Sequence, residues 1–294
     1  MSEAESRGVI RIAGSSIIDV RMWFDESPWR IAAGWTVLAA VLASGLSPAD
    51  LLAQASTVAL LFLLADPLWG SIWGLMSTPD SLPAIQRSMA RSRIWLPYLR
   101  SGSPAARLFG MDGPSILALI YKVALPGIFL ALVVSFILDP VALWLTVALI
   151  AVSTAGWLHQ QLESIPVRLL FVLAAVALPW LLVVLVLGVE AQLTVQLLLA
   201  GLWALHVWGS QSYQGDDPNV WGHKMWGITA IAVAQAGIGL LLILLQLPIW
   251  LFFLALFFLP TWLALYRGES LERVRFWWVA ALLTSGLAIG QIVV

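Results

Sequence analysis

Nine apolar stretches, each close to the length that crosses a lipid bilayer, most constrain how this chain folds. They cover residues 31–46, 51–76, 116–138, 140–158, 169–188, 192–209, 225–246, 248–266 and 276–294. A helical span needs about 20 apolar residues because the hydrocarbon core is about 30 Å thick. Inside lipid, a helix satisfies its own backbone hydrogen bonds, which an open strand or loop does not. The sequence therefore predicts an all-α, polytopic membrane bundle of about nine transmembrane helices.

The composition excludes several other classes of protein. Of the 294 residues, 61% are hydrophobic and 11% are charged, against about 45–50% and about 25% in soluble domains. A single soluble domain is excluded on these grounds. The net charge of −1 provides no basic field for nucleic acid. The chain has no cysteine, so a disulfide framework, thiol catalysis and cysteine-bound metals are excluded as well.

Two pairs of predicted helices meet with almost no loop, at Asp139-Pro140 and at Leu247-Pro248. Proline is favoured at the first position of a helix, where its missing N–H costs no hydrogen bond. We therefore expect two separate helices in each pair, restarting at the proline, rather than one long broken helix.

The basic residues predict the orientation in the membrane. If nine helices alternate in direction, fourteen of the fifteen lysines and arginines fall on one side. These are Arg7, Arg11, Arg21, Arg30, Arg87, Arg91, Arg93, Arg100, Arg107, Arg168, Lys224, Arg267, Arg273 and Arg275. Basic connections stay in the cytoplasm. We therefore expect a protein of the cell (inner) membrane, with a cytoplasmic N-terminus and a C-terminus on the opposite side.

The predicted domains are a cytoplasmic N-terminal segment (1–27) and a transmembrane domain (28–294). Val9–Phe24 mixes apolar with charged residues, as an interfacial helix on the inner leaflet does; a partly ordered tail is the alternative. Two inner connections are long, residues 77–115 and residues 210–224. A site that faces the cytoplasm would be built from these connections, because they carry polar groups that reach water.

A few polar residues lie inside predicted spans, where ionisable groups are costly and mark functional candidates. Asp66 and Lys122 are either a structural pair, or a site in which Asp66 holds a cation and Lys122 an anion such as phosphate. His206 is either a hydrogen-bonded interior histidine or a pigment ligand, bound axially to a tetrapyrrole metal. Gln235 and Gln246 are expected to form hydrogen bonds between helices. The 17 tryptophans predict an aromatic belt at the headgroups or the lining of a ligand site.

The pattern of spans and inner connections over residues 28–294 resembles the UbiA superfamily of intramembrane prenyltransferases. Locally, RSRIWLPYLRSGSPAARL after the second span and YQGDDPNVWGHKMWGI after the sixth are similar to that family's conserved stretches. The resemblance implies a polyprenyl diphosphate held through Mg²⁺ on two Asp-rich motifs. It also implies transfer of the prenyl group to an aromatic, tetrapyrrole or lipid acceptor.

By this resemblance, the magnesium ligands would be Asp66, Asp216 and Asp217. The contacts to the diphosphate would be Arg87, Arg93, Lys122 and Lys224. At other positions of the two motifs, where the family has Asn or Asp, this chain has Ala65, Trp69, Trp73, Gly209 and Ser212.

These replacements favour a non-catalytic or altered descendant of the family. Such a protein would bind an isoprenoid, a pigment or a quinone, or would serve as a structural subunit of a membrane complex. One alternative is a divergent, Mg²⁺-dependent prenyltransferase that moves a polyprenyl or phytyl group from its diphosphate. Another is a small transporter or lipid-handling protein, suggested by prolines within spans at Pro126, Pro179 and Pro260. The expected partners are membrane lipids and other membrane subunits, and no nucleic acid.

Overall fold

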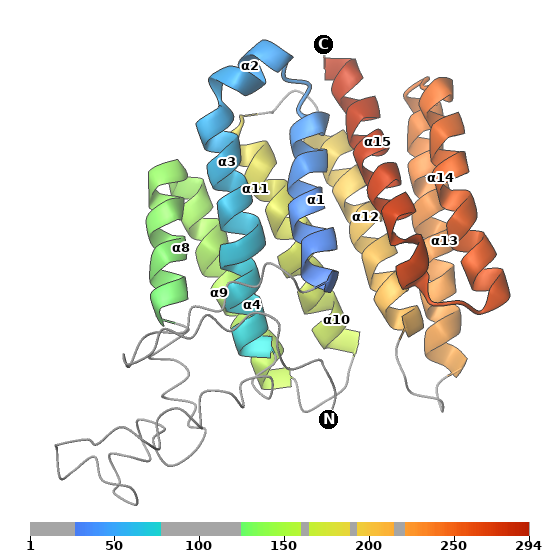
Figure 1. Ribbon diagram of the computed structural model, residues 1–294, viewed down its shortest axis with the longest axis horizontal. Helices are drawn as coiled ribbons and strands as arrows, with labels where there is room; N and C mark the ends of the chain where they lie inside the picture. The colour runs from blue at the N-terminus through green and yellow to red at the C-terminus, as the bar shows by residue number, and fades with distance from the viewer. Residues whose placement is uncertain (1–26, 78–124, 160–164, 189–192, 215–220, 294) are drawn as a thin grey trace, which may run out of the picture. The chain divides into compact units, whose positions relative to one another are not determined.

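The computed structural model (Figure 1) describes residues 27–77, 125–159, 165–188, 193–214 and 221–293. The chain divides into two compact units, residues 1–21 with 80–126 and residues 22–79 with 127–294. Of the first unit only Leu125 and Pro126 are described, so the fold below is that of the second unit. The expected interfacial helix at Val9–Phe24 lies outside the described residues.

Every regular element in the described part of the chain is helical. The elements are α1 (Ser27–Ala43), α2 (Pro48–Ala53), α3 (Ala55–Leu63), η2 (Leu64–Leu68), α4 (Trp69–Ser77), α8 (Leu125–Leu138), α9 (Pro140–His159), α10 (Ile165–Val172), η6 (Leu173–Ala177), α11 (Leu178–Val186), α12 (Leu193–Gln214), α13 (Trp221–Leu244), α14 (Pro248–Arg267), η7 (Leu271–Val274) and α15 (Arg275–Val293). Here η2 and η6 are π-helices and η7 is a 3₁₀-helix. The predicted all-α architecture is confirmed.

Five helical segments of the described chain are long and apolar enough to cross a membrane. They are Ala55–Gly74, Val167–Val186, Leu193–Tyr213, Lys224–Leu244 and Pro248–Arg267. The apolar parts of three other helices are shorter: Ala32–Ala43, Gly127–Leu138 and Pro140–Gly156. By the length and composition of its helices the chain is a multi-pass membrane protein. Nine crossings remain a prediction.

Both expected helix restarts are confirmed. After α8 ends at Leu138, α9 begins at Pro140, and the Asp139 carboxylate accepts a hydrogen bond from the Val141 N–H at 2.7 Å. Asp139 thus caps the new helix, because it satisfies one of the free N–H groups of the first turn. At the second joint α14 likewise begins at its proline, and the turn before it contains Gln246 at a φ of 59°.

Two of the long helical segments are interrupted near their middle by a π-turn. In η2 the N–H of Trp69 bonds to the carbonyl of Leu64, five residues back instead of four, and the same spacing closes η6. Pro67 lies inside η2, and Pro179 follows η6 by two residues. Proline removes the donor that an earlier carbonyl would use, and a local π-turn accommodates the loss. Both π-turns contact α1.

The first and last described helices, α1 and α15, cross closely through small residues. A Cβ atom on Gly286 would collide with the carbonyl oxygen of Ala39, and one on Gly290 with that of Leu42. Glycines four residues apart permit this approach of two backbones. Since the contacts advance in the same direction along both helices, α1 and α15 run parallel.

Two regions of this unit can be distinguished. The broken-helix region comprises α1, α3–η2–α4, α9 and α10–η6–α11, and the continuous-helix region comprises α12, α13, α14 and α15. Both regions expose large apolar side chains, such as Trp144 and Phe252. Exposed apolar surface of this kind is expected where a protein faces lipid.

Candidate functional site

Three of the predicted site residues belong to the described part of the chain. Asp66 lies in η2 and is half-buried, His206 is buried on α12, and Lys224 is exposed near the start of α13. The others lie outside the described residues: Arg87, Arg93, Lys122, Asp216 and Asp217. Among the described residues no three His, Asp or Glu side chains are grouped to hold a metal. The magnesium site therefore stays a prediction.

Asp66 is held at the contact between η2 and α1. The Trp29 indole donates a hydrogen bond from Nε1 to the backbone carbonyl oxygen of Asp66 at 2.8 Å. Gly70 leaves room for this indole, because a Cβ atom there would lie 2.5 Å from Trp29 Nε1. Across the contact, a Cβ atom on Gly34 would lie 3.1 Å from Asp66 Oδ1. The carboxyl group of Asp66 therefore packs directly against a small residue of α1.

Three aromatic rings fill the interior beside this contact. The ring of Trp29 stacks on that of Trp73, with centroids 6.5 Å apart and planes 19° apart. Phe171 of α10 meets both rings edge-on, at 6.0 and 5.8 Å. Such aromatic pairs contribute about 0.5–1.5 kcal/mol beyond the burial of their area. The three rings thus join α1, α4 and α10 in one packed cluster.

A chain of buried hydroxyl groups extends from the same region to α8. Trp69 Nε1 donates to Thr146 Oγ1 at 3.0 Å, and the Ser135 hydroxyl lies 2.6 Å from the same oxygen. All three side chains are fully buried. In lipid, hydrogen bonds of this kind tie helices together, so this chain links α4, α9 and α8.

A second buried polar cluster surrounds His206 in the continuous-helix region. His206 is 0% exposed. Its Nε2 lies 3.3 Å from Nε2 of Gln235, and Trp262 Nε1 donates to Gln235 Oε1 at 2.7 Å. The indoles of Trp203 and Trp278 meet the imidazole edge-on, with centroids at 5.2 and 5.1 Å. The cluster draws on all four helices of the region.

The aromatic walls of this cluster are themselves fixed in place. Trp203 Nε1 donates to Ser285 Oγ at 2.9 Å, and Trp278 Nε1 donates to Thr261 Oγ1 at 2.8 Å. Phe258 covers the imidazole face at a centroid distance of 6.4 Å, with planes 23° apart. None of these side chains is an acid, a lysine or an arginine. The cluster is therefore a neutral polar network enclosed by aromatic rings.

Sequence reasoning missed the main role of the tryptophans. Among the described residues, six indoles donate hydrogen bonds between two helical elements: Trp29, Trp69, Trp203, Trp250, Trp262 and Trp278. No spacing rule predicts which acceptor an indole meets, because the acceptor lies on another helix. The expected interhelical role of Gln235 is confirmed, whereas Gln246 lies in the turn before α14.

Comparison of the chain with protein-family models, with curated proteins and with solved structures found no match.

Proposed function

We propose that this chain is a UbiA-like membrane protein that no longer transfers prenyl groups. Its role would be to bind an isoprenoid, a pigment or a quinone, or to act as a structural subunit of a membrane complex. The proposal rests on one observation. At motif positions where the family has further carboxylates, this chain has side chains that pack between helices. Trp69 is fully buried on Thr146, and Trp73 is stacked on Trp29.

The second motif supports the same conclusion. A Cβ atom on Gly209 would lie 2.8 Å from the carbonyl oxygen of Gly227, and one on Gly227 would lie equally close to that of Gly209. A carboxylate at Gly209 would force α12 and α13 apart. Ser212 is also buried, at 3% exposure. The described residues thus do not fit a site for two Mg²⁺ ions, and we assign them no catalytic step.

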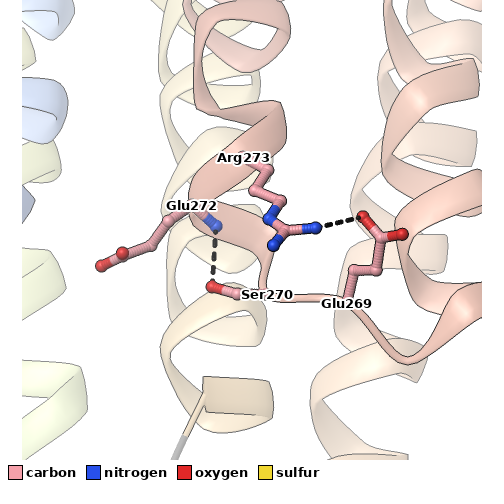
Figure 2. Close-up of polar contacts among 4 residues, drawn as sticks. All are labelled: Glu269, Ser270, Glu272 and Arg273. Carbon is pink, nitrogen blue, oxygen red and sulfur yellow. Dashed lines mark hydrogen bonds and ion pairs between the residues drawn. The ribbon is translucent and has the colours of Figure 1, made fainter.

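The proposed topology has nine crossings, a cytoplasmic N-terminus and a C-terminus on the opposite side. The parallel packing of α1 on α15 supports it, because an odd number of crossings makes the first and last helices run in the same direction. The charged turn between α14 and α15 supports it as well (Figure 2). There Arg273 pairs with Glu269 at 3.2 Å, and Ser270 Oγ accepts the Glu272 N–H at 3.3 Å. This turn would lie at the cytoplasmic headgroups.

Purification from native membranes in a mild detergent tests this function. We expect a stoichiometric partner, or an isoprenoid, pigment or quinone that extracts with the protein. In parallel, the purified protein is incubated with labelled polyprenyl diphosphates, Mg²⁺ and aromatic or lipid acceptors. It should form no more prenylated product than the Asp66→Asn/Asp216→Asn variant does. Turnover that this double substitution abolishes would establish the prenyltransferase alternative. A lone, ligand-free protein would contradict the binding and subunit roles.

Transport is a second candidate, favoured by the two π-turns that contact the same helix. Interrupted helices form the substrate sites of many transporters, and one of these interruptions contains Asp66. This candidate is tested with proteoliposomes attached to an electrode, by recording the current that follows a rapid change in pH or in the Na⁺ concentration. It predicts a transient current that Asp66→Asn abolishes. Currents no larger than those of protein-free liposomes would remove it.

A further inference from the structure

The charged residues of the continuous-helix region lie at one of its ends. Short turns join α13 to α14 and α14 to α15, so these helices alternate in direction, and the start of α13 shares an end with the turn between α14 and α15. All described acidic and basic residues of the region lie at this end: Lys224, Arg267, Glu269, Glu272, Arg273 and Arg275. Four basic against two acidic residues leave it with a net charge of +2.

The turn between α14 and α15 is anchored to the helices beside it. Gly268 ends α14 at a φ of 68°, and the N–H of Glu269 bonds to the carbonyl oxygen of Ala264 at 2.9 Å. Leu271 is fully buried in one cluster with Ile231 of α13 and Ala264 of α14. The charged side chains of the turn therefore project from a fixed backbone.

The basic residues at this end differ in whether an acid already neutralises them. Arg273 pairs with Glu269 at 3.2 Å, and the carboxylate of Glu272 points away from this pair (Figure 2). Within the described residues, Arg267 and Lys224 form no ion pair, and both are exposed. These two residues, the free cations below, are available to an anion from outside the protein.

Exposed aromatic rings accompany the free cations. Tyr266, next to Arg267, is 90% exposed, and Trp226, two residues after Lys224, is 66% exposed. Phe276 near the start of α15 is exposed as well. Tyrosine and tryptophan side chains favour the headgroup level of a bilayer, where basic residues attract anionic lipids. Cations beside exposed rings thus favour an anion that carries apolar chains over a small soluble one.

We propose that this end of the continuous-helix region binds an anionic phospholipid, whose phosphate meets Arg267 and Lys224. A guanidinium matches two phosphate oxygens at once, and an ammonium group provides a compact charge. The exposed rings would pack against the upper part of the lipid chains. The inference rests on the proposed topology, which places this end at the cytoplasmic headgroups, and it adds a surface site for a bilayer lipid to the proposed function.

Binding is measured with the full-length protein in neutral detergent, to which phosphatidylglycerol or phosphatidylcholine is added. We expect phosphatidylglycerol to raise the midpoint of thermal unfolding and to stay bound in native mass spectrometry, and phosphatidylcholine to do neither. Arg267→Gln and Lys224→Gln should each weaken the binding of phosphatidylglycerol about fivefold, the value of one basic residue at an anionic headgroup. Glu272→Gln removes a repelling carboxylate and should strengthen it.

Two controls separate a site from diffuse attraction. Glu269→Gln/Arg273→Gln removes a neutralised pair without changing the net charge, so binding should stay the same. Arg168→Gln removes one positive charge from the broken-helix region and should weaken binding clearly less than Arg267→Gln does. Equal losses from Arg168→Gln and Arg267→Gln would overturn the site. Equal stabilisation by the two lipids would overturn it too, and so would the same stabilisation by inorganic phosphate alone.

A failure of the lipid site is distinguishable from a failure of the proposed topology. The chain has no cysteine, so Glu272→Cys provides a single labelling position in the turn. A membrane-impermeant maleimide should label it only after the cells are permeabilised. Labelling in intact cells would contradict the topology, even if phosphatidylglycerol binds in detergent, where orientation has no influence. A cytoplasmic turn without preference for phosphatidylglycerol would overturn the lipid site alone.

Discussion

The broken-helix region and the continuous-helix region hold their helices together in different ways. In the broken-helix region, Trp29 donates to a backbone carbonyl, that of Asp66, at a place where a proline disturbs the helix. The region's other described indole donor, Trp69, meets a side chain, that of Thr146. In the continuous-helix region the described indole donors all meet side chains, as Trp262 meets Gln235 and Trp203 meets Ser285. The first region contains a carboxylate in its interior packing, whereas the polar network of the second is neutral.

This difference separates two uses of a buried polar group. In the broken-helix region the carbonyl of Asp66 already accepts the Trp69 N–H of its own helix, so the Trp29 indole is a second donor that joins α1 to the π-turn. In the continuous-helix region α13 is unbroken around Gln235, whose amide joins the Trp262 indole to the His206 imidazole. The broken-helix region is thus the better candidate for movement, and the continuous-helix region is the more rigid scaffold.

The largest effect is expected where the two regions meet, at α1 and α15. Gly286→Ala and Gly290→Ala would each place a methyl group against a backbone carbonyl that cannot rotate away. We expect each to lower the free energy of unfolding by about 3 kcal/mol, measured by thermal unfolding in detergent. Gly201→Ala is the control, because nothing lies within 4 Å of its Cβ position and alanine favours a helix. Equal stability of all three variants would disprove the close crossing.

A smaller loss is expected from Gly70→Ala in the broken-helix region. The new methyl group would displace the Trp29 indole, which can swing aside at the cost of its hydrogen bond and its stacking. We expect a loss of about 2 kcal/mol. In a Trp29→Ala background the same substitution should cost much less, because the indole is gone. Additive losses in this double-mutant cycle would show that the two residues are not in contact.

Removing single indole hydrogen bonds compares the two regions directly. Trp69→Phe and Trp203→Phe each remove one buried bond and should cost about 1 kcal/mol. Trp180→Phe is the matched control. Within the described residues its buried Nε1 has no acceptor, so stability should stay unchanged or rise. Equal losses at all three positions would mean that ring size, not hydrogen bonding, determines these effects.

The smallest effect is expected at the charged turn between α14 and α15. The side chain of Arg273 is 73% exposed and pairs with that of Glu269, four residues earlier. Because exposed ion pairs are screened by water and salt, Arg273→Gln should change the free energy of unfolding by less than about 0.5 kcal/mol. A loss comparable to that of Trp203→Phe would contradict our view that the interior network dominates this region.

The sequence predicted the helices well, because apolar length and prolines are local signals. The restarts at Pro140 and Pro248 followed from the preference of proline for the first position of a helix. The π-turns did not follow from the same signal. Pro260 lies inside α14 without a π-turn, whereas Pro67 lies inside one. The two prolines differ in their surroundings, which local sequence does not encode: η2 is largely buried, while much of α14 is exposed.

The candidate site was predictable in part. Asp66 and His206 stood out because polar residues in apolar spans are rare and costly. Their surroundings depend on contacts between distant segments, such as Gly34 with Asp66, which no local pattern encodes. Likewise, the Gln235 amide that meets His206 is bonded to Trp262, 56 positions beyond His206 in the chain. Sequence reasoning therefore identified the candidate residues without the partners that determine their chemistry.

The contact between α1 and α15 has a consequence for how the protein is made. α1 leaves the ribosome well before α15, which carries the glycines that receive its alanine-rich face. During translation that face remains in the bilayer, covered by lipid or by the insertion machinery, until α15 is synthesised. Translation stopped before residue 275 would thus release a chain whose earliest segment lacks its neighbour, and quality-control proteases of the membrane would be expected to degrade it.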